Sequence, residues 1–379
     1  MKIVYILPYD WGGMPHYTAE IANAVAENAD VIIIGSKEVP SEYFSDKVKI
    51  IRLFEAMPFS MNHLENILSL RCISAMFSFN RIKLIKEINP DLIHLTTPLL
   101  PPLAFFLFFQ GIDKKIPIIY TKHGLHSNSG LVKKIFEEYI LNFFERLISF
   151  KKIIVHTEFD RSELITTYNI NNEDIFVIPH GIYSFFRQFE SSIPEEKNTI
   201  LFFGNIREYK GLDVLLSAIP IIENQKIMIK TIIAGEGDIA QYQDLIKNCN
   251  GANFEIFNHY IPDDQVSVLF QRSSLVVLPY TKMSGMSGIL NIAYAFGKPV
   301  VVSDVGGLEE IIENNKTGIL VPPKDPVQLA NAIIRLLSDS ELRYSMERSV
   351  KKKSKELSWD SVATKTINVY IQSLKRKNN

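Results

Sequence analysis

Several features that mark other classes of protein are scarce in this chain. Its 379 residues include two cysteines, Cys72 and Cys249, which excludes a disulfide framework and a cysteine-rich zinc site and fits a reducing compartment. Lys and Arg (41) nearly balance Asp and Glu (42), so the net charge gives no indication of nucleic-acid binding. The longest apolar run, residues 98–109, is too short to span a bilayer.

Signals for metal binding and for secretion are missing as well. The sequence holds no Asp-x-Asp, no His-x3-His and no cysteine pair at ligand spacing, so no metal or other cofactor is expected. Residues 1–2 lead straight into a strand-like segment without a secretory pattern, which favours a cytoplasmic location. With 46% apolar residues, the chain can bury the cores of two domains.

Short apolar segments alternate with amphipathic segments twice along the chain, which predicts parallel sheets covered by helices on both faces. The expected strands of the first half are Ile3–Leu7, Val31–Ile34, Leu92–Leu95, Ile118–Thr121, Ile153–His156 and Phe176–Pro179. Those of the second half are Ile200–Gly204, Lys230–Ala234, Phe254–Phe257, Leu275–Leu278, Val300–Val302 and Gly318–Val321.

The halves are separated by the polar segment 189–198, which has the composition of a linker. The predicted fold class is therefore α/β, with two doubly wound Rossmann-like domains and a cleft between them. We expect the first domain at 1–188, the second at 189–358, and a C-terminal helix at 359–379 that returns to the first domain.

The stretch 279–322 is the most informative part of the sequence. A strand ends at Pro279, a loop of Ser, Gly and Met follows, and a helix is expected from about Gly288. Free N–H groups and the helix dipole at such a helix start both favour an anion. The stretch therefore predicts a phosphate-binding loop.

Two cations follow the first strand of the second half. Arg207 and Lys210 lie in a loop at its carboxyl end, where doubly wound sheets bind ligands. They can hold a diphosphate and stabilise the negative charge that develops as it leaves. The alternative is a solvated charged loop without this role. The segment 235–240 fits G-x-G-x-x-A, the dinucleotide fingerprint, but follows the second strand of its domain instead of the first.

In the first half, Gly12 and Gly13 sit between a strand and a helix. They allow either a close approach of backbone to ligand or a simple tight turn. His16 lies beside them at the helix start and can meet the same ligand. His123 ends a strand before a glycine; a lone histidine is more often a structural hydrogen-bonding group, but this position favours a functional role. Two further histidines also end strands, with position alone in their favour: His94 and His156.

The segment 63–134 combines basic and apolar residues. It contains nine Lys or Arg against four Asp or Glu, interleaved with aromatic runs. This composition fits a peripheral contact with the inner face of a membrane. Ordinary core elements with solvated ends explain it equally well.

The order and spacing of these motifs resemble the family 4 glycosyltransferases, retaining enzymes of the two-domain GT-B architecture, over nearly the whole chain. The matching segments are Gly12-Gly13 with His16, Thr-x-His-Gly at 121–124, Pro-His-Gly at 179–181 (usually Pro-Asn-Gly in the family), Gly-x5-Lys-Gly at 204–211, Ala-Gly-Glu-Gly at 234–237, Tyr-Ile-Pro-Asp at 260–263, and 295–307 followed by Glu310.

The resemblance implies transfer of a sugar from a UDP- or GDP-sugar to a glycan or lipid-linked acceptor, with retention and without a metal. The first domain would bind the acceptor and the second the donor. It implies the following roles: catalytic, His123, Arg207 and Lys210; donor-binding, Gly13, Asn205, Gly235, Ile261, Ser287, Gly288, Ile289 and Glu310; acceptor-side, Gly12 and His16. We expect a place in polysaccharide or other glycan biosynthesis.

The chain departs from the family pattern at two places. The family has an arginine directly after the first glycine of the motif at 204–211. This chain has Asn205 there, and Arg207 can substitute for the arginine. The Glu-x7-Glu pair falls on Ser284 and Ile292, which points to a branch without these carboxylates. A nucleotide-sugar binding subunit without catalysis, a GT-B epimerase and an NAD-dependent oxidoreductase remain as alternatives.

Overall fold

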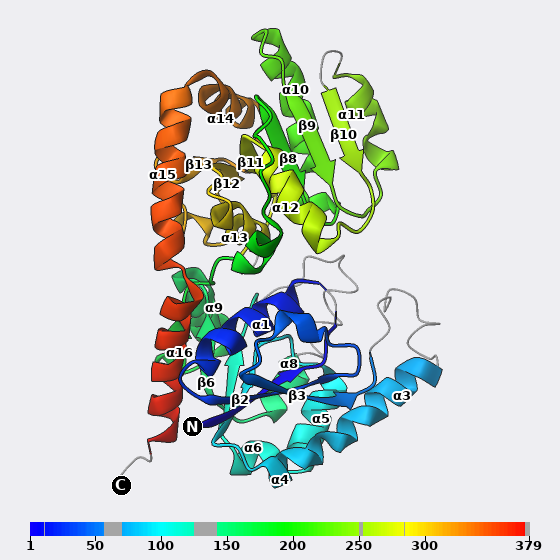
Figure 1. Ribbon diagram of the computed structural model, residues 1–379, viewed down its shortest axis with the longest axis vertical. Helices are drawn as coiled ribbons and strands as arrows, with labels where there is room; N and C mark the ends of the chain where they lie inside the picture. Colours follow the sequence, from blue (N-terminus) through cyan, green and yellow to red (C-terminus); the bar gives the residue numbers. More distant parts are fainter. Residues whose placement is uncertain (11, 57–69, 125–141, 250–252, 284, 376–379) are drawn as a thin grey trace. The chain divides into compact units, whose positions relative to one another are not determined.

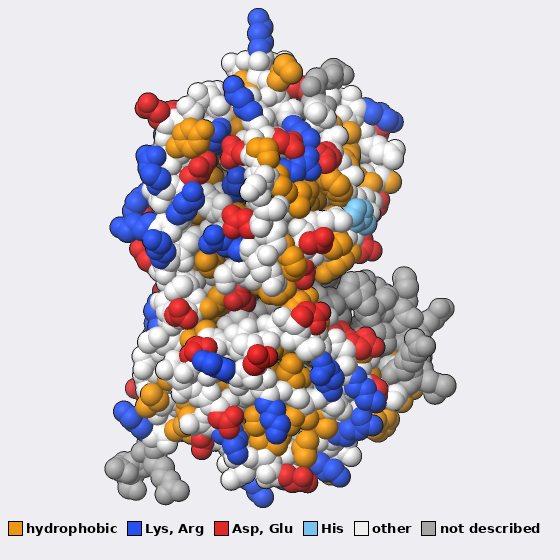
Figure 2. All heavy atoms as spheres, viewed as in Figure 1, with side chains coloured by type: hydrophobic (Ala, Val, Ile, Leu, Met, Phe, Trp, Pro, Cys, Tyr) orange, Lys and Arg blue, Asp and Glu red, His pale blue; other side chains and the backbone are white. Residues whose placement is uncertain are grey.

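The computed structural model describes residues 1–10, 12–56, 70–124, 142–249, 253–283 and 285–375. The chain forms two compact units, one made of Met1–Pro179 with Trp359–Asn379 and the other of His180–Ser358. Among the described residues, no helix is long and apolar enough to cross a membrane. Figure 2 shows basic and acidic side chains interspersed on the visible face of each unit, in keeping with the balanced composition.

The first unit is built on a parallel sheet with strand order β3-β2-β1-β4-β5-β6-β7 (Figure 1). Its strands are β1 Lys2–Leu7, β2 Asp30–Ser36, β3 Val48–Phe54, β4 Leu92–Leu95, β5 Ile118–Thr121, β6 Phe150–Val155 and β7 Ile175–Val177. Most strand residues are buried and apolar, as expected for a sheet covered on both faces.

Helices connect these strands. The α-helices are α1 Gly13–Ala26, α3 Leu70–Ser78, α4 Ile85–Ile88, α5 Pro101–Phe109, α6 Ile112–Lys115, α8 Asn142–Leu147, α9 Glu158–Tyr168 and α16 Trp359–Leu374, and the short 3-10 helices (η) are η1 Ser41–Tyr43, η2 Phe79–Leu84 and η4 Asn172–Asp174. Phe54 and Phe79 pack with ring centroids 4.7 Å apart in one apolar core of this unit.

The second unit holds a parallel sheet with strand order β10-β9-β8-β11-β12-β13. Its strands are β8 Thr199–Phe203, β9 Lys230–Ala234, β10 Asn253–Phe257, β11 Leu275–Leu278, β12 Val300–Ser303 and β13 Gly318–Val321. Its helices are η5 Ser184–Phe189, η6 Glu208–Lys210, α10 Leu212–Asn224, η7 Ala240–Tyr242, α11 Gln243–Lys247, α12 Asp263–Arg272, α13 Gly288–Ala295, η8 Leu308–Glu310, α14 Pro326–Ser338 and α15 Ser340–Glu356.

Two layers of helices sandwich this second sheet because successive strand side chains point to opposite faces. Phe202 joins the core that α10 and α14 cover. Its neighbour Phe203 points the other way and meets Phe270 of α12 at 5.2 Å between ring centroids. One strand thus supplies apolar side chains to two layers.

The predicted α/β class with two doubly wound sheets is confirmed, as is the order of the expected strands, although their ends shift: β6 is Phe150–Val155 in place of Ile153–His156. One strand was missed. β3 lies at the sheet edge and carries Lys49 and Arg52, which break the apolar run that reveals buried strands.

The C-terminal helix returns to the first unit, as predicted. α16 packs on α1, and the Tyr370 hydroxyl lies 2.6 Å from His94 Nδ1 and 2.7 Å from the Tyr5 hydroxyl. The boundary between the units falls at Pro179 and His180, ahead of the expected 188, because η5 packs against α12 and α13 of the second unit.

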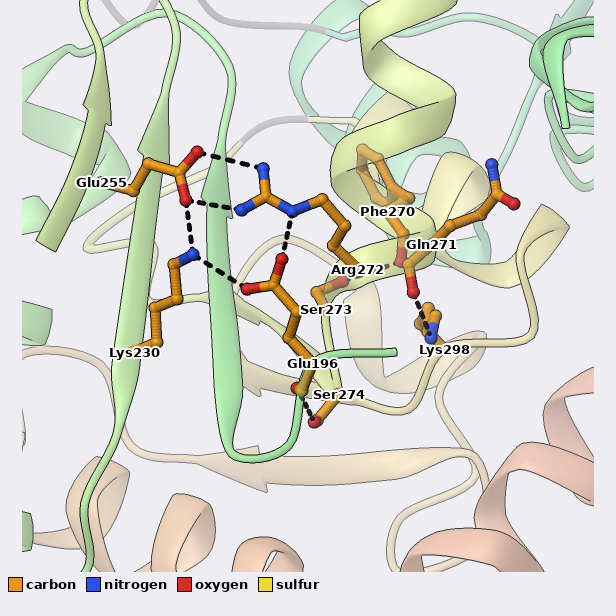
Figure 3. Close-up of polar contacts among 9 residues, drawn as sticks. All are labelled: Glu196, Lys230, Glu255, Phe270, Gln271, Arg272, Ser273, Ser274 and Lys298. Atoms are coloured by element: carbon orange, nitrogen blue, oxygen red, sulfur yellow. Dashed lines mark hydrogen bonds and ion pairs between the residues drawn. The ribbon is translucent and has the colours of Figure 1, made fainter. Parts of the chain in front are cut away.

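Four charged side chains tie the linker to the second sheet (Figure 3). Arg272 of α12 donates to Glu255 of β10 through both terminal nitrogens, at 3.0 and 2.6 Å, and through Nε to Glu196, at 2.5 Å. Lys230 of β9 pairs with the same two carboxylates at 2.6 and 2.8 Å. Hydrogen bonds and charge from Arg272 and then Lys230 lower the pKa of Glu255 to about 2.

Replacing Arg272 with Met leaves two partly buried carboxylates with one cation between them. We expect the free energy of unfolding to fall by about 1–3 kcal/mol at pH 7. The pKa of Glu255 lies below its unfolded value of about 4.3, so its stabilising contribution is complete above that pH and is lost as pH falls towards 2. The difference between Arg272→Met and wild type in the free energy of urea unfolding should therefore shrink from pH 7 to pH 3.

Arg187→Met, which breaks an exposed pair with Glu190, serves as control and should cost under about 1 kcal/mol. Equal losses for both variants, or a pH-independent difference, would contradict this account.

Candidate functional site

The second sheet reverses its strand order between β8 and β11. From β8 the chain continues to β9 and β10 on one side, whereas β11, β12 and β13 lie on the other. Loops leaving β8 and β11 at their carboxyl ends therefore diverge from a topological switch point, where open α/β sheets bind ligands. The first of these loops carries Arg207 and Lys210, and the second leads to Ser287.

A chain of hydrogen bonds joins the two loops. Lys210 Nζ donates to the Tyr280 hydroxyl at 3.1 Å, and this hydroxyl lies 2.9 Å from Ser287 Oγ. Lys210 also lies over two aromatic rings, at 4.4 Å from the centroid of Tyr280 and 5.3 Å from that of Tyr209. The ammonium group is thus held in place without a carboxylate partner in this chain of contacts.

Removal of Lys210 from water is the largest influence on its charge and lowers its pKa, with Tyr209 acting in the opposite direction. Desolvation disfavours the ammonium form, and a bound anion would restore it. An anionic ligand at this position would therefore stabilise the ammonium form of Lys210.

Ser287 caps the helix that follows the loop. Its Oγ accepts from Leu290 N at 3.4 Å, so α13 begins at Gly288 with an N-cap of the preferred type. Gly288 approaches Tyr183, where an added Cβ would lie 3.2 Å from the ring. The predicted loop-to-helix junction is therefore present, with Ser287, Gly288 and Ile289 at its start.

Close backbone contacts explain the glycines of these loops. Gly211 has φ +70°, and an added Cβ would lie 1.9 Å from the carbonyl oxygen of Pro279. Gly235 has φ +144°, and an added Cβ would lie 2.2 Å from Gly204 O and 3.2 Å from Asn205 N. A side chain at Gly211 would separate the loops after β8 and β11, and one at Gly235 would separate those after β8 and β9.

The structure thus brings several expected donor residues together in the second unit. Asn205 abuts Gly235, the side chain of Ile289 lies against Gly204, and Lys210 connects to Ser287 through Tyr280. Asn205 and Arg207 are exposed, Ile261 is buried ahead of α12, and Glu310 is exposed at the end of η8. Ser284 lies outside the described residues.

The dinucleotide fingerprint fails in the structure. Gly237 pairs with Ile206 as an isolated bridge and donates to Asn258 Oδ1 at 3.1 Å. The segment continues into the 3-10 helix η7 and the short α11, so no long helix opens at Ala240 to receive a pyrophosphate. The motif at 235–240 therefore no longer supports the NAD-dependent oxidoreductase alternative.

The expected residues of the first unit gather around α1 and the carboxyl ends of β4 and β5. Gly12 is the N-cap of α1 with φ +74°, and Gly13 is its first residue. His16 is buried and stacks on Tyr43 with centroids 4.5 Å apart. His123 donates through Nε2 to Thr96 O at 2.7 Å, and burial lowers its pKa to about 4.

Among the described ranges, no group of three or more His, Cys, Asp or Glu side chains could hold a metal ion. The groups available to bind an anion in the second unit are cations and backbone N–H groups. Tyr280 is the residue that sequence reasoning missed. Its position directly after Pro279, at the end of a strand beside the phosphate-binding loop, is the signal that could have revealed it.

Comparison with known families agrees with this geometry. Residues 11–183 match the family model described as Glycosyltransferase Family 4, and residues 185–353 match the model described as Glycosyl transferases group 1. The two matches include strands of both sheets. The chain belongs to the family 4 glycosyltransferases, which confirms the resemblance seen in its motifs.

Similar proteins include two curated relatives and one solved structure. An uncharacterized glycosyltransferase of Methanocaldococcus jannaschii is 32% identical over 227 residues, which cover 55% of this chain and 57% of that protein. The D-inositol 3-phosphate glycosyltransferase of Corynebacterium diphtheriae is 26% identical over 285 residues, 67% of this chain and 65% of that protein. The matches thus span little more than half to about two thirds of these relatives. The structure of HepE from Anabaena in complex with UDP superimposes with a TM-score of 0.71 at 15% identity, covering 98% of this chain and 100% of that one, so the two share the GT-B fold.

Replacing Gly211 with Ala tests the close contact between the two loops. The added Cβ meets Pro279 O, and the positive φ adds strain of about 1 kcal/mol, so we expect the free energy of unfolding to fall by more than 2 kcal/mol in urea titration. Gly111→Ala is the matched control, because Gly111 has φ +60° with nothing within 4 Å of an added Cβ, and it should cost only about 1 kcal/mol. Equal losses in the two variants would show that the contact is not tight.

Proposed function

We propose that this protein transfers a sugar from a nucleotide diphosphate sugar, a UDP- or GDP-sugar, to a glycan or lipid-linked acceptor, with retention and without a metal. The observation that carries the proposal is the position of Lys210. It lies at the switch point of the second sheet, desolvated by two tyrosine rings and linked through Tyr280 to the cap of α13. The UDP bound in the HepE structure supports a nucleotide ligand for this fold.

In this proposal the second unit binds the donor. Lys210 and Arg207 neutralise the diphosphate and stabilise the charge on the departing nucleotide, the task that a divalent cation performs in other enzymes. The N–H groups of Gly288 and Ile289 at the start of α13 face phosphate or sugar oxygens. Asn205, Gly235, Ile261 and Glu310 complete the donor site.

The first unit is proposed to bind the acceptor and to orient the transferred sugar. His123 stands at the carboxyl end of β5, beside the β1–β4 switch point of that sheet, and Gly12, Gly13 and His16 belong to the start of α1. No protein base is required if the departing phosphate accepts the acceptor proton.

Lys210→Ala tests the proposal directly. We expect the rate of sugar transfer, measured as release of nucleoside diphosphate, to fall about a hundredfold or more, as when one charge-stabilising group is removed from a transition state. Lys247→Ala is the control, since Lys247 is 71% exposed on α11 of the same unit. Transfer by Lys210→Ala at the wild-type rate would overturn the assigned role.

A nucleotide-sugar binding subunit without catalysis is the second candidate. It is favoured by Ile292, which is buried in α13 at the position of the second glutamate of the family's Glu-x7-Glu pair. Calorimetric binding of a nucleotide sugar, without any release of nucleoside diphosphate in the presence of acceptors, would establish the subunit and exclude the enzyme.

We also propose a peripheral membrane contact at the inner face of a membrane. It is carried by an aromatic patch on α5, formed by Phe105, Phe108 and Phe109, which are 45%, 40% and 74% exposed. Phe105 stacks on Phe109, and Lys114 lies 5.7 Å from the Phe108 centroid, so a cation borders the rings. The expected segment 63–134 is described here except for 63–69 and 125–134.

Serine at all three patch positions should abolish co-sedimentation with vesicles that contain anionic lipid, because both apolar insertion and the adjoining charge contribute. Wild-type binding should weaken as salt is raised. Phe159→Ser, at a 44% exposed position on α9, is the control and should bind like wild type. Absence of wild-type binding at low salt would remove the proposed contact.

A further inference from the structure

Two histidine rings meet at the carboxyl ends of β5 and β6 in the first unit. His123 Nδ1 lies 3.2 Å from His156 Nε2, and the ring centroids are 5.0 Å apart. The other nitrogen of each ring faces a backbone carbonyl: His123 Nε2 lies 2.7 Å from Thr96 O, and His156 Nδ1 lies 2.9 Å from Ile178 O. Carbonyl, ring, ring and carbonyl thus form a line of three hydrogen-bond contacts.

Imidazole chemistry limits how this line can be protonated. Carbonyl oxygens only accept, so the outer nitrogen of each ring must carry a hydrogen. A neutral imidazole has one N–H, so two neutral rings would oppose two lone pairs across the 3.2 Å contact. Two fully protonated rings would oppose two N–H groups. A single additional proton between the rings satisfies all three contacts.

We propose that His123 and His156 act as one ionisable unit that holds a single proton between their rings. His156 is then a positioning residue: it fixes the orientation of His123 and sets its proton affinity. His123 was expected to act near the transferred sugar, whereas His156 had only its position at a strand end in its favour.

An aromatic ring and a third histidine surround the pair. Tyr17 of α1 packs its ring at 4.4 Å from His123 and 5.6 Å from His156, and burial raises its pKa. Burial lowers the pKa of His94 on β4 to about 3, so this ring is neutral near neutral pH.

Two charged groups nearby in sequence have partners outside the pair. Lys122, adjacent to His123, donates to Glu145 at 2.5 Å. Asp160 of α9 accepts from the hydroxyl of Thr157 at 2.7 Å. These contacts link Lys122 to Glu145 and Asp160 to Thr157.

Burial and the shared proton have opposite effects on the pKa of His123. Loss of hydration lowers the pKa of this ring to about 4. A proton on Nδ1 gains an acceptor in His156, however, and removes the opposition of two lone pairs. The pair should therefore bind its first proton at a higher pH than His123 would without its partner, and the midpoint belongs to both rings together.

Nitrogen NMR of the protein with labelled histidine rings, without any substrate, tests the proposal independently of the function. Resonances of His123 Nδ1 and His156 Nε2 should shift together at one midpoint above about pH 4, with Nε2–H on His123 and Nδ1–H on His156 throughout. In His156→Leu the midpoint of His123 should fall by about one pH unit or more, a tenfold loss of proton affinity. Separate midpoints in wild type, or an unchanged midpoint in His156→Leu, would overturn the proposal.

A second variant, His156→Gln, distinguishes proton sharing from simple packing. This measurement of activity rests on the proposed function. His156→Gln retains a polar partner that can hydrogen-bond His123 in either charge state but cannot ionise. We expect wild-type kcat/KM for an anionic donor to rise as pH falls through the midpoint of the pair. Because His123 itself remains ionisable, His156→Gln should transfer sugar with this inflection moved to lower pH, and His156→Leu should be impaired at every pH. An inflection of His156→Gln at the wild-type pH would contradict the shared proton, whereas absence of transfer in wild type would contradict only the proposed function.

Discussion

The second unit depends on the direct contact between the loops after β8 and β11. Parallel pairing of these strands brings both loops to one edge of the sheet, and the absence of a side chain at Gly211 lets the backbone approach the carbonyl of Pro279. Lys210, one residue earlier, then reaches the hydroxyl of Tyr280. The position of the cation follows from this backbone contact.

The two units place their functional groups by the same rule of topology but with different chemistry. In the second unit, a cation and a capped helix start stand at the carboxyl edge of the sheet, an arrangement suited to an anion. In the first unit, histidines follow β5 and β6 and are bound to backbone carbonyls. In our proposals, the first set offers a cation to an anionic ligand, whereas the charge of the second depends on one shared proton.

The sequence revealed the fold well because both sheets are buried on two faces, so their strands are short apolar runs. It missed β3, where edge charges interrupt the run, and placed the unit boundary late, because the aromatic residues of η5 pack on the second unit. Motif order singled out Lys210 and Ser287 as candidates. Tyr280 and the pairing of His123 with His156 depend on distances between segments 70 and 33 residues apart, which no local pattern encodes.

We propose above all that the second unit uses Lys210 and the start of α13 to bind a nucleotide diphosphate sugar for transfer. The most direct test is a binding and turnover measurement with a panel of UDP- and GDP-sugars, following thermal unfolding and release of nucleoside diphosphate. The account predicts that at least one donor raises the unfolding temperature and is consumed without added metal. If no donor shifts the unfolding temperature or is consumed, the account is wrong.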